Sequence, residues 1–280
     1  MSDHNIGRYL WQLKNDGFAE ENYLPDYLPK TTIQTGQLYR LGTHLLLCGD
    51  ATKKEHISKL LNKTKVNLVL TDPPYNVRYG DKDDFLGPVG RGNRIPFGYD
   101  SDNLQDPDKD LLRPAFTNTK EYLASYNSIY VFYGGFFLAW LDSALRSVGA
   151  KTIHILIWRK NSPVLGRTDY LYQHELIAYT WIGRHRFYGK NQTSVWDYEK
   201  PRVNTIHPTM KPIAMLRKAI VNSSRKGERV LDMFGGSGST LIASEQTGRR
   251  CYMMELDPRY CQVIINRWEA YTNAKAEKLN

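Results

Sequence analysis

The sequence predicts an α/β fold in which helices cover both faces of a doubly wound, mostly parallel sheet. Short apolar segments without polar alternation, such as 66–70, are typical of strands buried on both faces of a parallel sheet. From residue 128 onward such segments alternate with helical periodicity, which indicates strand–helix–strand units. A glycine-rich turn after the apolar segment at 229–233 adds a strand-to-helix connection that is common in nucleotide-binding α/β folds.

The first half of the predicted sheet begins with a hairpin that turns at Gly42-Thr43. A helix follows, and we expect Thr52 to be its N-cap, with Glu55 three residues later completing a capping box. A short, unalternating strand comes next. These strands, helix and final strand are expected at residues 38–41, 44–47, 52–62 and 67–70.

The second half alternates strands and helices without internal repeats. One helix has an apolar face of leucines at 138, 141 and 145, and the last helix has a proline in its first turn. The strands are expected at residues 128–133, 152–158, 176–181, 229–233 and 251–255, and the helices at 135–147, 212–223, 239–247 and 258–271.

Two segments lack the pattern of a packed element. Residues 1–36 are polar and aromatic and contain Pro25 and Pro29, which favours a loosely packed N-terminal arm over a partner-binding segment. Residues 77–114 are rich in glycine and proline and have no periodicity, so we expect a mobile loop there, with a solvated insertion as the alternative. Residues 37–280 are then one domain.

The composition suits a cytoplasmic protein with an anionic partner. No apolar run approaches the roughly 20 residues of a membrane span, and the N-terminus lacks the apolar core of a signal peptide. The three cysteines lack metal-ligand spacing and are interpreted as reduced core residues, and no convergent metal-ligand set is present. The net charge of +9 is compatible with nucleic acid, although charge alone decides little.

The turn Phe234-Gly235-Gly236-Ser237-Gly238 after Asp232 predicts a nucleoside site. Its glycines allow a ligand to approach the backbone, and a helix N-terminus adds unpaired N–H donors. The spacing is neither the dinucleotide fingerprint nor a phosphate loop, which would need a lysine. Asp232 suits a cationic ligand group, and Glu255 is placed to accept hydrogen bonds from ribose hydroxyls. The alternative is a tight strand–helix turn with two solvated acids.

The motif Asp72-Pro73-Pro74-Tyr75 ends the predicted strand at 67–70 and predicts a substrate site. The prolines remove two backbone donors, so the carboxylate and the carbonyls around Pro73 remain as acceptors. Acceptors of this kind hold an exocyclic amine, and Tyr75 offers a flat face on which a base can stack. A base within a duplex must be flipped out to reach such a pocket. The alternative is a simple strand-terminating Asp-Pro turn.

These two motifs, in this order, resemble the β class of S-adenosylmethionine-dependent DNA amino-methyltransferases over roughly residues 37–272. The resemblance implies a circularly permuted, Rossmann-like methyltransferase sheet and S-adenosylmethionine as the cofactor. It also implies that 207–212 contacts the methionine carboxylate, and that Gly49-Asp50 lies near the adenine. The implied cofactor contacts are Asp50, Ala51, Thr209, Lys211, Asp232, Phe234, Gly235, Gly236, Ser237, Gly238 and Glu255, and the implied catalytic residues are Asp72, Pro73, Pro74 and Tyr75.

The segment 182–206, where this class carries target recognition, is short and mixes basic with aromatic residues. Such mixtures contact phosphates and stack on bases, although a basic surface strand pair is the alternative. Because the segment is brief, we predict either a short or degenerate target sequence, or help from the 77–114 loop or a second subunit. The predicted DNA-binding residues are Arg91, Arg94, Arg184, Arg186 and Lys190.

The predicted activity is methylation of adenine N6 in a flipped-out base of double-stranded DNA. Methylation of cytosine N4 is the nearest alternative, because the same motif can hold that amine. The aspartate at the first motif position and the motif order disfavour protein-glutamine methylation, and the intact acids disfavour a non-catalytic DNA-binding subunit. The resemblance also implies a homodimer, a restriction endonuclease partner and a bacterial or phage origin as open alternatives.

Overall fold

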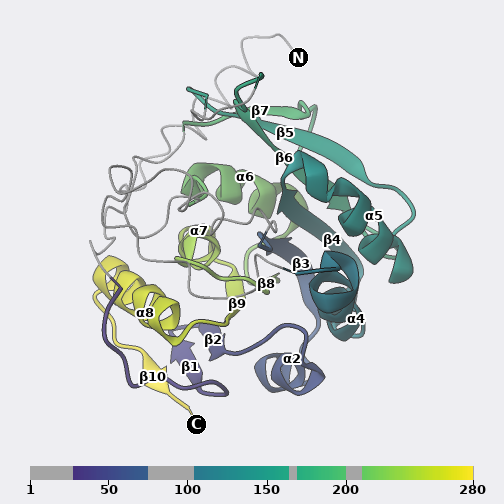
Figure 1. The fold of residues 1–280 in the computed structure, drawn as a ribbon. Coiled ribbons are helices and arrows are strands. Elements are labelled where there is room, and N and C mark those ends of the chain that lie inside the picture. Colours follow the sequence, from purple (N-terminus) through teal and green to yellow (C-terminus); the bar gives the residue numbers. More distant parts are fainter. Residues whose placement is uncertain (1–27, 75–103, 164–168, 200–209, 280) are drawn as a thin grey trace.

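The computed structural model describes residues 28–74, 104–163, 169–199 and 210–279, which form ten strands of one sheet flanked by helices. The strand order is β10-β1-β2-β9-β8-β3-β4-β6-β5-β7 (Figure 1). Five neighbouring strands in the centre are mutually parallel. They are β2 (His44–Cys48), β9 (Arg250–Glu255), β8 (Arg229–Asp232), β3 (Val66–Thr71) and β4 (Leu123–Tyr133).

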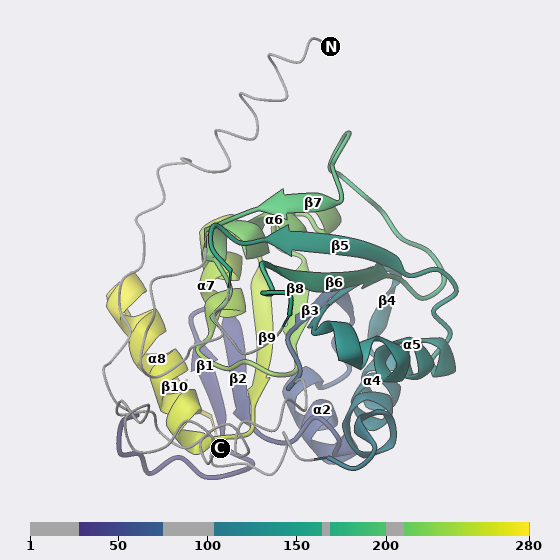
Figure 2. The same cartoon turned by 45° about the horizontal axis from the view of Figure 1, so that its top comes forward.

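Strands of mixed direction extend the sheet on both sides of this centre. Beyond β4, β6 is antiparallel to both β4 and β5, and β7 pairs in parallel with β5 (Figure 2). On the opposite side, β1 pairs with β2 and β10 pairs with β1, both antiparallel. These strands are β6 (His174–Thr180), β5 (His154–Arg159), β7 (Val195–Asp197), β1 (Leu38–Leu41) and β10 (Glu277–Lys278).

Helices cover both faces of the sheet, which confirms the predicted doubly wound fold (Figure 1). One face packs on the apolar sides of α2 (Lys54–Leu61), α4 (Arg113–Lys120) and α5 (Leu138–Ser147). The other face packs on α6 (Ile213–Ser223), α7 (Ser239–Thr247) and α8 (Pro258–Thr272). In the chain the strand of the acidic motif precedes the strand of the glycine motif, which is the permuted order.

Two predictions about the first half of the chain are wrong. The helix α2 begins at Lys54 and has no side-chain cap, because the Thr52 hydroxyl donates to Asp50 instead of capping. The predicted loop 77–114 ends in a π-helix at Asp108–Leu112 that runs into α4, and residues 75–103 lie outside the described part. Leu112, Ala115 and Phe116 of this region are buried in the core.

Residues 28–36 are the described part of the predicted N-terminal arm. Ile33 is buried, and the Thr31 hydroxyl donates to Gln262 on α8, so residues 31–36 pack on the domain instead of lying loose.

The strands β7 and β10 were not predicted. The cysteines 48, 251 and 261 are free and buried, as the sequence suggested. In the described residues no helix is long and apolar enough to cross a membrane.

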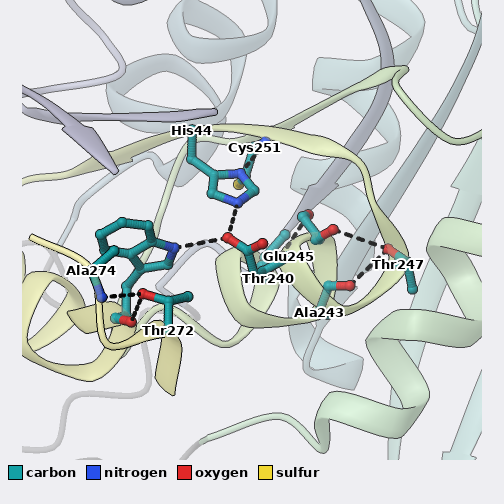
Figure 3. Close-up of polar contacts among 10 residues, drawn as sticks. His44, Thr240, Ala243, Glu245, Thr247, Cys251, Thr272 and Ala274 are labelled. Carbon is teal, nitrogen blue, oxygen red and sulfur yellow. Dashed lines mark hydrogen bonds and ion pairs between the residues drawn. The ribbon is translucent and has the colours of Figure 1, made fainter. Parts of the chain in front are cut away.

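A buried polar cluster joins two strands to two helices at the amino ends of β2 and β9 (Figure 3). His44 Nδ1 accepts a 2.8 Å hydrogen bond from Cys251 N, so Nε2 carries the proton and donates to Glu245 Oε2 at 2.9 Å. Trp268 Nε1 donates to the same carboxylate oxygen at 2.9 Å. The cluster therefore fastens α7 and α8 to the sheet at the edge opposite the candidate site.

Candidate active site

Thr71, the last residue of β3, connects the two sequence motifs directly. Its hydroxyl donates a 2.8 Å hydrogen bond to Asp232 Oδ1 at the end of β8. The Thr71 hydroxyl oxygen also accepts a 3.2 Å hydrogen bond from Met233 N. Because β3 and β8 are adjacent parallel strands, Asp72 and the turn that begins at Phe234 leave the sheet side by side. The carboxyl edge of a parallel sheet is where such folds bind ligands.

The acidic motif presents acceptors at this edge. The Asp72 side chain is partly exposed, at 26% of its area, whereas Pro73 is buried and Pro74 is half-buried. Neither proline has a backbone N–H, so this stretch offers the Asp72 carboxylate and carbonyl oxygens to a ligand. Tyr75 lies outside the described residues, so its predicted stacking role stays a prediction.

A row of four charged side chains runs along the carboxyl edge from β3 to β5. Lys211 Nζ lies 2.5 Å from Asp72 Oδ2 and 3.3 Å from Glu175 Oε2. Lys160 Nζ lies 2.7 Å from Glu175 Oε1. The two lysine side chains are only 5% and 6% exposed. The row alternates positive and negative charge, and its members come from four separate parts of the chain.

The row favours the ionised forms of Lys211 and Glu175. Burial alone would lower the pKa of Lys211, but the Asp72 and Glu175 carboxylates outweigh it and raise this pKa above its ordinary value. Burial would likewise raise the pKa of Glu175, but Lys211 and Lys160 lower it. Lys211 was predicted to bind a methionine carboxylate, and in the structure its ammonium group contacts carboxylates of the protein itself.

The glycine turn packs so closely on its neighbours that side chains are excluded at two positions. A Cβ at Gly235 would lie 2.8 Å from Met253 Cγ, and Gly235 N donates to Met254 O. Gly236 and Gly238 have φ of +52° and +85°, the left-handed region that favours glycine. The N–H groups of Gly235 and Gly236 donate to Met254 O and Glu255 Oε2, so the backbone of the turn is held against the carboxyl end of β9.

A buried arginine of α8 donates hydrogen bonds to the glycine turn and to the start of α7. Arg267 is 1% exposed, and its NH1 donates to Ser237 O at 2.9 Å and to Ser239 Oγ at 3.2 Å. This role could not be predicted from the sequence, because Arg267 lies 30 residues from Ser237 and belongs to an amphipathic helix. The contact fixes the turn at the start of α7.

Glu255 connects the glycine turn to the loop after β2. Its Oε2 accepts a 2.7 Å hydrogen bond from Gly236 N, and its Oε1 accepts one of 2.8 Å from Asp257 N. Gly49 N donates to Glu255 O, which brings Asp50 to the same place. Each carboxylate oxygen has a second lone pair, so Glu255 can also accept from ligand hydroxyls.

Asp50 and Ala51 are held in place by protein contacts. Asp50 Oδ1 accepts hydrogen bonds from Thr52 N and Thr52 Oγ1, at 2.8 and 2.7 Å. Asp50 N donates to His56 Nδ1, and the Asn118 amide on α4 donates to Ala51 O. These hydrogen bonds hold the loop in place beside Glu255, and the cofactor contacts of Asp50 and Ala51 stay a prediction.

Two carboxyl groups of the cofactor side have strongly raised pKa values. Burial raises the pKa of Asp232 to about 7, although hydrogen bonds from Thr240, Thr71 and the Phe234 backbone oppose the shift. Burial also raises the pKa of Glu255 to about 7, against hydrogen bonds from backbone N–H groups. Carboxyl groups poised near neutral pH are typical of ligand sites.

Comparison with known proteins places the chain in a family. The pattern that defines the N6/N4 DNA methylases matches residues 66–267. The chain belongs to this family. A type II methyltransferase, M2.DpnII of Streptococcus pneumoniae, is 23% identical over 234 residues, which are 76% of this chain and 87% of that protein.

Two solved structures resemble the fold of this methylase. The M1.HpyAVI complex with S-adenosylmethionine has a TM-score of 0.59 at 20% identity, and the match covers 79% of this chain and 98% of that one. The PvuII cytosine-N4-specific DNA methyltransferase has a TM-score of 0.58 at 16% identity, with 81% and 89% covered. At these identities the likeness shows the fold alone.

The residues of the methylase fit S-adenosylmethionine, the methyl donor of its family. The Gly235 backbone packs directly on Met253 and Met254, which holds the glycine turn beside Glu255 at the carboxyl edge. Glu255 has unused lone pairs for ribose hydroxyls, and the Asp232 carboxyl lies at the start of the turn, where a cationic group would meet it. In the part of the chain that the structure describes, no group of three or more His, Cys, Asp and Glu could hold a metal ion.

Two of the predicted DNA-binding arginines, Arg184 and Arg186, do not lie with this site. Asn127 N donates to Arg184 O, and the guanidinium of Arg186 stacks 4.1 Å from the centre of the Tyr126 ring. Tyr126 is at the amino end of β4, whereas the site is at the carboxyl ends. Lys190 follows in the same exposed segment, and Arg91, Arg94 and Thr209 lie outside the described residues.

Sequence reasoning missed Lys160 and Glu175 as parts of the site. Lys160 follows β5 and Glu175 lies within β6, two strands that pair with each other beyond β4. Only the sheet order brings them to Asp72, and that order is not encoded in a local motif. A buried strand that contains a glutamate was the one available signal, because buried charges need partners.

Proposed function

We propose that this methylase transfers the methyl group of S-adenosylmethionine to adenine N6 in double-stranded DNA. The observation that carries the proposal is the Thr71–Asp232 hydrogen bond, which puts the acceptor-rich Asp72 motif directly beside the glycine turn. A site for an amine and a site for a nucleoside cofactor thereby share one edge of the sheet. The family membership supports the same conclusion at the level of DNA amino-methylation.

The protein's own contribution is positioning and electrostatics. The cofactor supplies a methyl group already activated on a sulfonium. Asp72 and the Pro73 carbonyl accept hydrogen bonds from the two amine hydrogens of the flipped base, which directs the nitrogen lone pair away from the ring. The neutral amine is a poor base, so Asp72 acts as an acceptor before methyl transfer and the proton leaves afterwards. Tyr75 stacks on the base.

Adenine is favoured because an aspartate, rather than a serine, begins the motif. Cytosine N4 is the second candidate, and the fold likeness to a cytosine-N4-specific enzyme is the observation that favours it. The two bases present a similar amine beside a ring nitrogen, and the described part of the pocket contains no group that separates them. A homodimer and a restriction endonuclease partner are further proposals that the family resemblance suggests.

Product analysis tests the proposal. The purified protein is incubated with unmodified genomic DNA and methyl-labelled S-adenosylmethionine, and the DNA is digested to nucleosides. We expect the label in N6-methyladenine. Label in N4-methylcytosine would assign the second candidate instead. Absence of label on DNA, with measurable cofactor binding, would reject both and indicate a binding subunit or a different acceptor.

A further inference from the structure

Lys160 and Glu175 lie in the site without belonging to either sequence motif. Lys160 directly follows β5 and Glu175 lies in β6, on the opposite side of β4 from Asp72. Lys211 connects them to the acidic motif, because its ammonium group lies between Asp72 and Glu175. Lys211 Nζ also lies 5.2 Å from the centre of the Phe132 ring on β4, so the row crosses that strand.

Each member of the row limits the position of the next. A lysine side chain has four rotatable bonds, so one ion pair to Asp72 would leave the ammonium group free to move with the carboxylate. The second contact, to Glu175, fixes Lys211 to the sheet, and Lys160 fixes the other oxygen of Glu175. The backbone of Lys160 is itself clamped, because its N–H donates to Gln173 O and its carbonyl accepts from the Gln173 amide.

Stability alone is a poor reason for this arrangement. Burying four charges costs desolvation, and apolar residues of similar volume often stabilise a protein equally well or better. The row instead fixes the position of the Asp72 carboxylate relative to the sheet. The glycine turn follows β8, the neighbour of β3 in the same sheet, so the carboxylate is also fixed relative to that turn. Methyl transfer needs such a place, because a misplacement of about 1 Å costs on the order of 100-fold in rate.

We propose that Glu175 and Lys160 are positioning residues that hold Lys211, and through it the Asp72 carboxylate, at the target amine. The inference rests on the proposed methyl transfer and adds two residues to the machinery that performs it. It also assigns Lys211 to the substrate side of the site. The methionine carboxylate of the cofactor is then bound by other groups.

The test uses Glu175→Gln, which keeps the size of the side chain and removes its charge. We expect kcat on saturating duplex DNA to fall by about 30-fold, within the range for one misplaced group. The dissociation constant for S-adenosylmethionine, measured by calorimetry without DNA, should stay within about twofold of wild type. Lys211→Met should behave in the same way, whereas a lysine that binds the methionine carboxylate would weaken cofactor binding by 10-fold or more.

A neutralised double variant separates positioning from structure. Lys160→Met combined with Glu175→Gln removes one charge of each sign, so it should recover thermal stability relative to Glu175→Gln alone. If the pair positions Asp72, kcat remains low in the double variant despite the recovered stability. Recovery of kcat together with stability would show a structural role and overturn the proposal. Glu228→Gln, at the amino edge of the sheet, is the matched control and should keep full activity.

The proposed function and this inference fail in different ways. If the wild-type protein binds the cofactor but methylates no DNA base, the proposed function is refuted, and this inference is refuted with it. An active wild type together with a fully active, folded Glu175→Gln variant removes the inference alone. A folded Glu175→Gln variant with low kcat and unchanged cofactor binding supports both.

Discussion

Asp232 and Glu255 are carboxyl groups that exchange protons near neutral pH, and this makes cofactor binding pH-dependent. Their pKa values are raised from 3.8 and 4.5 to about 7 in the folded protein. An ammonium group and ribose hydroxyls prefer the ionised carboxylates, so affinity for S-adenosylmethionine should rise between about pH 6 and pH 8. Calorimetry across this range measures the effect, and Glu255→Gln should flatten it. A dissociation constant independent of pH contradicts the assignment.

The same two groups influence folding stability in the opposite direction. In the unfolded chain they ionise near pH 4, whereas in the folded protein they keep their protons to about pH 7. The folded state therefore binds more protons between these values, and their contribution to stability falls as pH rises from about 4 to about 7. Bound cofactor should offset this loss at neutral pH.

Asp72 is the residue whose loss should separate catalysis from cofactor binding. Asp72→Ala removes the acceptor for the amine, and turnover should fall below detection. The dissociation constant for S-adenosylmethionine should stay nearly unchanged, because the ion pair of this side chain is with Lys211 and not with the glycine turn. Label transfer and calorimetry give the two values. Asp142→Ala, an exposed partner of Arg146 on α5, is the control, and measurable turnover in Asp72→Ala would refute the catalytic assignment.

Gly235 is the position where one added carbon should block the cofactor site. A Cβ there would meet Met253 at 2.8 Å and the Met254 carbonyl at 3.2 Å, so Gly235→Ala must shift the turn away from β9. We expect a loss of cofactor affinity of 10-fold or more. Gly135→Ala is the matched control, because nothing lies within 4 Å of its added carbon. Equal affinities in the two variants would contradict the close packing of the turn.

At the scale of elements, the His44–Glu245–Trp268 cluster predicts a pH-dependent stability. The hydrogen bond from His44 holds the pKa of Glu245 below its ordinary value, so the contribution is present above about pH 4.5 and is lost as pH falls through the lower folded value. Glu245→Ala should lower the free energy of unfolding by about 1–3 kcal/mol at pH 7, because two buried donors lose their acceptor. Urea unfolding measures this, and the difference should shrink in acid.

Elements with local signals at both ends were predicted well. The bounds of α7 match the prediction because left-handed glycines at 238 and 248 begin and end it. The prediction for α2 failed because the Thr52 hydroxyl donates to Asp50, two residues earlier, and does not cap the helix. The strands β7 and β10 have three and two residues, too few to show a period, and only pairing with long neighbours makes them strands.

The site was predictable to the extent that it is encoded in contiguous motifs. The acidic motif and the glycine turn were recognised from sequence and meet in the structure. Lys160, Glu175 and Arg267 were not, because each acts through a partner that is distant in the chain. Arg184 was predicted from composition, and composition does not tell at which edge of a sheet a residue lies.

At the scale of the molecule, Arg184 and Arg186 are separated from Asp72 by the length of β3. Six residues of strand span about 20 Å, so these arginines cannot touch the flipped base. If they contact phosphates of flanking DNA, Arg184→Ala with Arg186→Ala should reduce the slope of log affinity against log salt by about two and leave kcat at saturating DNA within twofold. Fluorescence anisotropy measures binding. Arg40→Ala with Arg146→Ala is the control of equal charge, and an unchanged slope would argue for the basic-surface alternative.

The hydroxyl of Thr71 reaches Asp232 across 161 positions of sequence. The spacing of methyl donor and acceptor is therefore set by the separation of two neighbouring strands, about 4.8 Å, and not by the chain that runs between them. Recognition segments inserted in that stretch can lengthen, shrink or be exchanged while the chemistry keeps its geometry. The protein is accordingly a suitable scaffold for exchanging recognition segments, provided that the exchange leaves β4, β5, β6 and Lys211 unchanged.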